Sequence, residues 1–222
     1  MSKRNIIIDS GTGSGKTTLL NCLSEYIPDR ERIVTIEDTA ELQLKNSHVV
    51  SMKTKRANAE GKGEYTIQAL VRNALRMRPD RIVVGEDTEG PKRLDMLRSP
   101  MNTGHDGSMT TLHANSPEDV PLRLEVLVGM AADLPVESIH RQISSAVDLI
   151  VQLQRIGRRR VVSHVTEVVD FDPIRRRVRL KELFRIRPNR QDSLAVPTGY
   201  LPSYIHELQD QNLLDLSVFF AN

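Results

Sequence analysis

The sequence lacks the features that mark secreted and membrane-spanning proteins. Cys22 is the only cysteine among 222 residues, so no intrachain disulfide is possible and a reducing compartment is the simpler expectation. No apolar run approaches the roughly 20 residues that a transmembrane helix needs. Residues 1–4 lead directly into an apolar segment and do not have the layout of a signal peptide. We therefore expect a cytoplasmic protein.

An excess of charge of one sign is also missing. The 31 basic and 29 acidic side chains nearly cancel, and the formal net charge is +2 at pH 7. Tryptophan is absent and aromatic residues make up 4% of the chain, so few side chains could stack on nucleic-acid bases. Two arginine runs, 158–160 and 175–177, raise the alternative of a DNA-translocating motor. Both flank predicted hairpin strands, where alternate side chains point to solvent, and we expect no nucleic-acid partner.

Hydrophobic residues make up 39% of the chain, which is enough for one sizeable folded domain. Short runs rich in β-branched residues recur along it and are separated by helical patterns or loops. These predicted strands cover residues 5–9, 32–37, 81–86, 108–113 and 148–153. Their alternation predicts an α/β fold with a mainly parallel sheet and helices on both faces.

Two predicted helices have clear start or stop signals. Between residues 66 and 78, apolar residues recur at the spacing of one helix face, and Pro79 ends the pattern. Ser116 and Pro117 supply an N-cap hydroxyl and a proline at the first helical position. Asp119 adds acidic charge near the positive end of the helix dipole. We expect one helix over residues 66–78 and another that starts at Ser116.

The pattern changes in the last third of the chain. Two alternating segments, 161–169 and 178–184, are joined through Asp172 and Pro173 and predict a hairpin that adds antiparallel strands to the sheet. The proline-rich remainder predicts a loop followed by a small docked helix. We therefore expect a main domain over residues 1–187 and a C-terminal loop with a short helical tail over residues 188–222.

A glycine-rich segment lies between the first predicted strand and the helical segment that follows it. Its residues are Gly11, Thr12, Gly13, Ser14, Gly15, Lys16, Thr17 and Thr18. In this setting, glycines allow successive backbone N–H groups to converge on phosphate oxygens at a helix N-terminus. Lys16 can neutralise charge on the β- and γ-phosphates, and the Thr17 hydroxyl can ligate Mg²⁺. The segment therefore predicts a nucleotide-binding phosphate loop.

One position departs from the phosphate-loop pattern G-x-x-x-x-G-K-T. The first glycine would fall at residue 10, where this sequence has Ser10. A serine must adopt the backbone angles that glycine would have supplied, and a positive φ would cost it on the order of 1 kcal/mol. Ser10 is therefore one of the positions that put enzymatic activity in question.

Two predicted strands end in carboxylates. Residues 81–86 form an apolar strand that ends in Glu86, which is the layout of a Walker B segment. We expect Glu86 to face Mg²⁺ and to act as general base or to position the attacking water. Another strand ends in Glu37 and Asp38, at the edge of the sheet where open α/β folds bind ligands. Glu37 is thus a second candidate catalytic residue.

A further predicted strand ends at His113, and Asn115 follows two residues later. A lone histidine is usually structural. Here, however, the strand is the next one along the chain after Glu86. We therefore expect His113 to sense the γ-phosphate or the state of Glu86.

These segments, in this order, resemble the type II/type IV secretion ATPase superfamily, most closely its tight-adherence (Flp-type) pilus branch. The resemblance runs from about residue 5 to residue 184. Besides the phosphate loop, Glu86 and His113, it rests on the segments 35–39, 60–64, 74–80 and 101–107.

The resemblance implies a RecA-like ATPase domain over residues 1–187 that binds ATP and Mg²⁺ as part of a homohexameric ring. It also implies attachment to inner-membrane platform proteins of a secretion or pilus system, which would make the cytoplasmic chain peripheral at the inner membrane. Members of the family normally carry a separate N-terminal domain. Since this chain starts at the strand of the phosphate loop, it resembles the C-terminal half alone.

Two further positions depart from the family pattern. The family usually has Val-Arg-Gly after the Walker B glutamate, whereas this chain has Asp87, Thr88 and Glu89. It usually has an arginine where Lys55 stands, although Arg56 is adjacent. Such arginines help to neutralise phosphate charge, and lysine lacks their bidentate fork. Two functions therefore stay open: an ATP-hydrolysing motor core, or a degenerate nucleotide-binding subunit with little or no ATPase activity.

Overall fold

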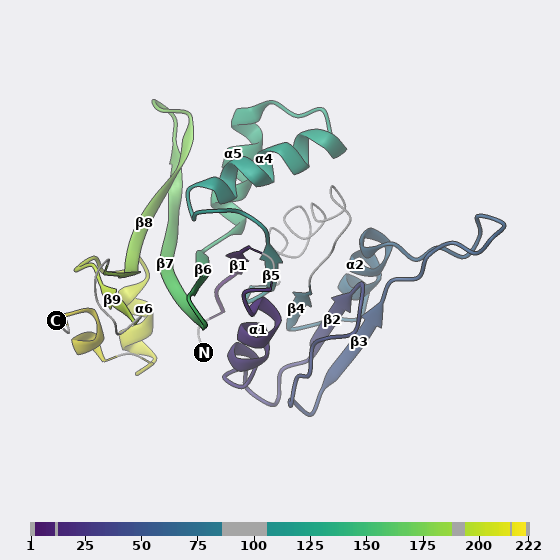
Figure 1. The fold of residues 1–222 in the computed structure, drawn as a ribbon, viewed down its shortest axis with the longest axis horizontal. Coiled ribbons are helices and arrows are strands. Elements are labelled where there is room, and N and C mark those ends of the chain that lie inside the picture. Colours follow the sequence, from purple (N-terminus) through teal and green to yellow (C-terminus); the bar gives the residue numbers. More distant parts are fainter. Residues whose placement is uncertain (1–2, 12, 86–105, 188–193, 214, 221–222) are drawn as a thin grey trace.

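The computed structural model describes residues 3–11, 13–85, 106–187, 194–213 and 215–220 (Figure 1). The predicted positions Thr12 and Glu86 lie outside these ranges, as do Asp87, Thr88 and Glu89 and most of the segment 101–107. Within the described ranges, no helix combines the length and the apolar character needed to cross a lipid bilayer.

The strands of the described ranges form one sheet with the order β3-β2-β4-β5-β1-β6-β7-β8-β9. The first six in this order are parallel to one another, and β7, β8 and β9 continue the sheet as antiparallel strands. The parallel strands are β1 (Ile6–Ser10), β2 (Ile33–Glu37), β3 (Val49–Lys53), β4 (Arg81–Val84), β5 (Met109–Leu112) and β6 (Leu149–Ile156). The predicted α/β fold with an antiparallel addition is confirmed.

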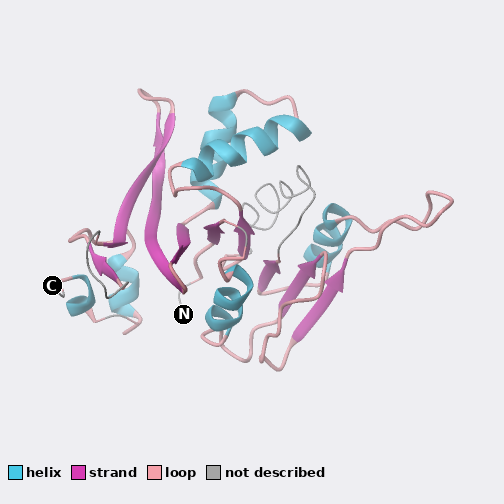
Figure 2. Cartoon of the chain, viewed as in Figure 1, coloured by secondary structure: helices cyan, strands magenta, loops and turns pink. Residues whose placement is uncertain are grey.

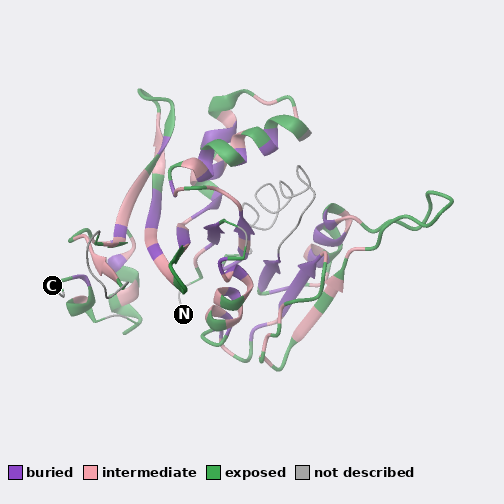
Figure 3. Ribbon diagram, in the orientation of Figure 1, coloured by how far each residue is buried: buried purple, intermediate pink, exposed green. Residues whose placement is uncertain are grey.

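The parallel strands β1, β2, β4 and β5 are buried because helices cover both faces of the sheet (Figures 2 and 3). In β1, Ile6 and Ile8 pack against Leu20 of α1 on one face. Ile7 points to the other face and belongs to the core formed with α2, α4 and α5. These helices are α1 (Lys16–Ser24), α2 (Ile67–Arg76), α4 (Asp119–Ala131) and α5 (Val136–Ala146). Because both faces are covered, β1 needs apolar side chains on both.

The helix signals of the sequence are found at their expected places. The Thr66 hydroxyl caps α2 by accepting from the Ala69 N–H at 3.2 Å. Ser116 accepts from the Asp119 N–H at 3.3 Å, but regular α4 begins only at Asp119. The residues between Ser116 and Asp119 form a turn that leads into the helix.

The predicted hairpin consists of β7 (Arg159–Asp172) and β8 (Arg177–Ile186). After it, β9 (Ala195–Pro197) pairs with β8 and was not predicted. The predicted tail helix is present as α6 (Ile205–Asp210), and a 3₁₀ helix (Leu216–Phe219) follows it. The division of the chain at residue 187 stays a prediction.

The connection between β3 and α2, residues 54–66, extends away from the body of the molecule (Figure 1). Its two limbs are joined by a bridge between Lys55 and Tyr65, whose backbone N–H and C=O groups pair at 3.0 and 2.8 Å. Lys55 and Arg56 are exposed in this arm. The basic side chains that stand at the family's arginine position therefore lie in an exposed, extended arm.

Candidate functional site

The phosphate loop connects the buried strand β1 to the N-terminus of α1. Gly13 and Gly15 have φ angles of 73° and 98°, a backbone conformation that residues with a Cβ rarely adopt. Gly15 is the N-cap of α1, and its carbonyl accepts the N–H of Leu19 at 2.9 Å. The N–H groups of the first turn of a helix have no acceptor within the helix, and those of α1 lie at the end of the loop, where an anion would bind. Thr18 is exposed in the same turn.

Ser10 occupies the glycine position without the expected strain. It is the last residue of β1, is fully buried, and is not among the described non-glycine residues with positive φ. Its hydroxyl donates to the Gly11 carbonyl at 3.0 Å, and the Ser14 hydroxyl reaches the same carbonyl at 2.7 Å. The expectation of a backbone penalty at Ser10 is therefore wrong, because strand β1 continues through this residue.

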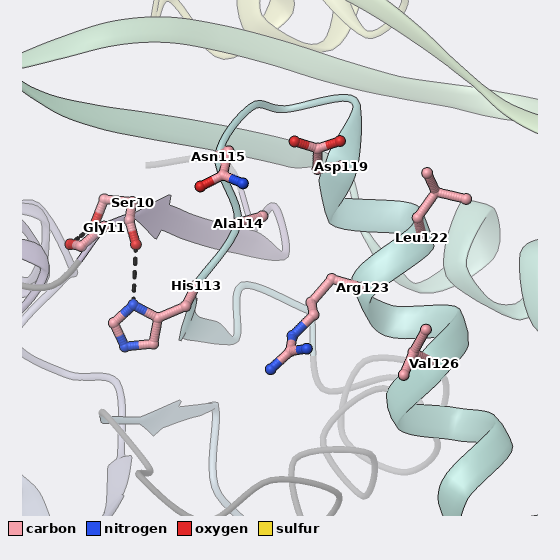
Figure 4. A pocket seen from close by; sticks show the side chains of 9 residues that line it. All are labelled: Ser10, Gly11, His113, Ala114, Asn115, Asp119, Leu122, Arg123 and Val126. Atoms are coloured by element: carbon pink, nitrogen blue, oxygen red, sulfur yellow. Dashed lines mark hydrogen bonds between the residues drawn. The ribbon is translucent and has the colours of Figure 1, made fainter.

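The side chains of Lys16 and His113 are in contact at the C-terminal end of β1. The Lys16 side chain is only 3% exposed, and its Nζ lies 3.3 Å from His113 Nδ1. The same His113 nitrogen lies 3.1 Å from the Ser10 carbonyl oxygen (Figure 4). This contact is possible because β5, which ends at Leu112, is the direct neighbour of β1. The structure thus brings His113 into contact with Lys16 and Ser10, from which it is separated by 97 and 103 positions along the chain.

Glu37 is buried at the end of β2, where it shapes the following turn. Its Oε1 accepts the backbone N–H groups of Glu41 and Leu42 at 2.9 and 2.8 Å. A Cβ at Gly85 would lie 3.0 Å from Glu37 Cγ, so the side chain lies directly beside the end of β4. Glu37 therefore sits next to the position from which the chain continues to Glu86.

A cavity of about 480 Å³ lies between the start of the phosphate loop and α4. Ser10, Gly11, His113 and Asn115 form one wall, and the other wall includes Asp119 and Arg123 of α4 (Figure 4). Predicted residues of the loop and of the histidine strand therefore line one cavity at the carboxyl edge of the sheet. The walls carry both charge signs, with Asp119 and Arg123 facing the cavity from the same helix.

A profile of the type II/IV secretion system protein family matches residues 1–194 of this sequence. The chain belongs to this family. Among curated relatives, a putative conjugal transfer protein of Mycobacterium tuberculosis is 46% identical over 157 residues, which are 70% of this chain and 44% of that protein. The type IV secretion system protein VirB11 of Bartonella quintana is 38% identical over 178 residues, or 79% and 48% of the two chains. The chain thus spans about half the length of the curated relatives it matches.

Solved structures support the same assignment. The VirB11 ATPase of the Brucella suis type IV secretion system, in complex with sulphate, is 34% identical to this chain, with a TM-score of 0.63. The match covers 73% of this chain and 48% of the VirB11 chain. The pilus retraction motor PilT with bound ADP is 27% identical with a TM-score of 0.58, and the coverage is 79% and 50%. The core of this secretion-family chain is therefore RecA-like.

Glu41 is a residue of this family member that the motif analysis missed. The Thr17 hydroxyl, expected to ligate Mg²⁺, donates to Glu41 Oε2 at 3.0 Å. Hydroxyl and carboxylate oxygens are ligands that Mg²⁺ accepts, so this corner fits the ion. Within the described ranges, no group of three His, Cys, Asp or Glu residues could hold a metal by itself. Glu41 lies four residues beyond Glu37, and its proximity to Thr17 depends on the Glu37 turn.

Arg160 was considered in the sequence only as part of a basic run. In the structure, its Cδ lies 3.3 Å from the point that a Cβ on Gly15 would occupy. The side chain therefore packs over the phosphate loop from β7, beside the first residue of α1. The contact arises because β6 pairs with β1 and the β6–β7 turn ends at the same edge of the sheet.

Asp9 is the third residue that the motif analysis missed. It is fully buried in β1, immediately before Ser10. Its Oδ1 accepts the backbone N–H of Ala114 at 2.5 Å. Burial raises the pKa of the Asp9 carboxyl group from 3.8 to about 7, although the Ala114 and Ser10 N–H groups and the charge of Lys16 lower it. A buried aspartate before a phosphate loop could have been noticed as a polar break in an otherwise apolar strand.

Proposed function

We propose that this chain is the ATP-binding and ATP-hydrolysing core of a motor that drives a secretion or pilus assembly machine. The observation that carries the proposal is the phosphate loop with Lys16 buried against His113 at the carboxyl edge of the parallel sheet. Relatives point the same way, since the Brucella VirB11 is described as an ATPase of a type IV secretion system and PilT as a retraction motor with bound ADP.

In this proposal each residue of the loop has a physical role. The N–H groups of α1 and the Lys16 ammonium hold the phosphates and offset their charge. The Thr17 hydroxyl, with Glu41 beside it, would hold Mg²⁺, which neutralises phosphate charge when bound. Glu86 removes a proton from the attacking water or orients it, and Glu37 holds the neighbouring turn in place. His113 reports the state of the γ-phosphate through its contact with Lys16.

The assembly expected for such a motor is a homohexamer that docks on inner-membrane platform proteins. The match covers only about half of each relative, so the rest of a complete motor would supply further contacts. The chain would then act in the cytoplasm and be peripheral at the membrane through its partners.

The competing function is a degenerate subunit that binds nucleotide without turnover. The unstrained geometry of Ser10 removes one of the reasons for it. Steady-state hydrolysis of Mg²⁺–ATP by this chain, and by a longer form that includes the N-terminal half of its relatives, separates the two. Hydrolysis by the longer form supports the motor. Binding without hydrolysis in both forms supports the degenerate subunit.

Glu86→Gln is expected to keep ATP binding and to stop turnover. An amide can hold a water molecule by a hydrogen bond but cannot take its proton, and loss of a general base lowers rates by roughly 100-fold or more. Nucleotide affinity by fluorescence and turnover by phosphate release are measured on the same preparation. Equal turnover in variant and parent would transfer the role of base to Glu37.

Arg160→Gln is expected to weaken ATP binding roughly tenfold, because a hydrogen bond to a charged phosphate contributes about 1.5–3 kcal/mol. Arg159→Gln is the matched control. It makes the same change in net charge, but its side chain points to the opposite face of β7. Equal losses in the two variants would show that only the overall positive charge matters and that Arg160 has no specific contact.

A further inference from the structure

Asp9 and Gln152 are direct neighbours on adjacent strands. They are register partners in the parallel pair of β1 and β6, so their side chains leave the sheet on the same face. Both are almost completely buried, at 0% and 2% exposure. Neither belongs to the phosphate-loop motif, and the proposed reaction does not use either of them.

Each of the two side chains has one oxygen without a partner. Asp9 Oδ1 accepts the Ala114 N–H, whereas Oδ2 is buried and has no hydrogen bond. Gln152 Nε2 donates to the Asn115 carbonyl at 2.8 Å, which orients the amide and leaves Oε1 buried without a donor. The two unpartnered acceptors thus belong to register partners on one face of the sheet, and an unmade hydrogen bond in a buried position is costly. A single proton on Asp9 Oδ2 would supply the missing donor.

The paired side chains hold the segment that carries His113. Ala114 is fixed by Asp9 and Asn115 by Gln152, so both anchors act on the two residues that follow His113. His113 in turn contacts Lys16 and the Ser10 carbonyl. The connection from the buried pair to the phosphate-binding lysine is therefore continuous and short.

We propose that Asp9 is a proton-dependent positioning residue, whose neutral carboxyl group bridges to Gln152 and fixes His113 against Lys16. The charged groups around it fit this role. Lys16 of α1 lowers the pKa of Asp9 and Asp119 of α4 raises it, but burial is the largest influence and places the pKa at about 7. His113 lies at the end of β5, where its ring contacts the Ser10 carbonyl, and His164 of β7 is the register partner of Gln152.

Loss of the proton changes the site in two ways. The bridge to Gln152 is broken, which releases the segment that bears His113. The new carboxylate also attracts Lys16 and repels phosphate, so ATP affinity falls as pH rises through about 7. This second consequence rests on the proposed nucleotide-binding function, whereas the titration of Asp9 does not.

The sign of the stability effect follows from the raised pKa. The folded chain holds the Asp9 proton more tightly than the unfolded chain, in which the aspartate titrates at about pH 4. The contribution of protonated Asp9 to the stability of the folded chain is therefore complete below about pH 4 and is lost as pH rises through about 7.

The decisive variant is Asp9→Asn, which has the same shape as the neutral acid. Its amide oxygen can accept from Ala114, and its N–H₂ group can donate to Gln152 without any proton to lose. Binding of a fluorescent ATP analogue with Mg²⁺ is measured at pH 6 and pH 8.5. The parent is expected to lose roughly tenfold in affinity relative to Asp9→Asn over this interval. Titration of the phosphate itself affects both proteins equally and cancels in the comparison.

A second measurement uses the unmodified chain and does not depend on nucleotide. The carboxyl carbon of Asp9, followed by NMR, is expected to titrate with a midpoint of about 7. Asp119→Asn should move this midpoint to lower pH, because it removes a nearby negative charge, and Gln152→Met should do the same by removing the acceptor of the proton.

The outcomes are distinct. A midpoint at the ordinary value of an aspartate, or identical pH profiles for parent and Asp9→Asn, would overturn the proposal. If neither protein binds the ATP analogue at any pH while the Asp9 carbon still titrates near 7, the proposed nucleotide-binding function is wrong. The assignment of Asp9 as a buried acid with a raised pKa would still hold.

Discussion

Lys16→Ala is expected to reduce ATP affinity by about 100-fold or more, because it removes the ammonium group that pairs with the phosphates. Lys16 is 3% exposed and lies against His113, so its position is set by packing and not by chance contact at the surface. The loss should appear in isothermal titration with Mg²⁺–ATP. Circular dichroism verifies that the fold is intact.

Two variants control this experiment. Lys16→Met keeps most of the side-chain volume and should bind ATP as poorly as Lys16→Ala, since charge and not volume is missing. Lys45→Ala removes an exposed lysine whose partner is Glu25, the C-cap residue of α1, and it should leave binding unchanged. Unaltered affinity in correctly folded Lys16→Met would refute the assignment of the phosphate loop.

Arg81→Ala is expected to lower the free energy of unfolding by about 3–5 kcal/mol, the range for breaking a buried ion pair by removing one partner. Arg81 begins β4 and is completely buried, and its Nε donates to Glu31 Oε2 at 2.5 Å. Its Nη1 donates to the Gly107 carbonyl at 3.3 Å. Truncation would leave the Glu31 carboxylate buried without its cation, and denaturant unfolding measures the cost.

An exposed ion pair offers the matched control. Arg179 pairs with Asp170 at the surface of the β7–β8 hairpin, and Arg179→Ala should leave the free energy of unfolding nearly unchanged because solvent screens such pairs. Arg81→Met combined with Glu31→Gln should recover part of the loss, since no uncompensated charge remains. A loss at Arg81 no larger than at Arg179 would contradict the prediction.

Most strands and helices could be predicted because their signals are local. The apolar run of β1, the cap at Thr66 and the turn at Asp172 each depend on residues a few positions apart. The two strands that were missed have weak local signals. β3 is a partly exposed edge strand with polar Ser51 in its middle, and β9 has only three residues and ends in Pro197. Their pairing with longer strands stabilises them, and a local pattern does not contain that information.

The site was predictable in its motif and not in its surroundings. The loop residues, Glu37 and His113 could be proposed from spacing, and Lys16 and His113 do meet. The roles of Asp9, Glu41 and Arg160 could not be proposed, because they depend on which elements become neighbours. Asp9 matters because β1 lies between β5 and β6, and Arg160 because the β6–β7 turn reaches the loop.

By itself, the sequence determined the α/β class, the phosphate loop and the family resemblance, since these rest on backbone geometry and residue types within short segments. Only the tertiary structure decided the strand order, the unstrained backbone at Ser10 and the buried pair of Asp9 and Gln152. The reason is physical. A hydrogen bond or a desolvated charge depends on distances between residues far apart in the chain, and those distances exist only after the strands have paired.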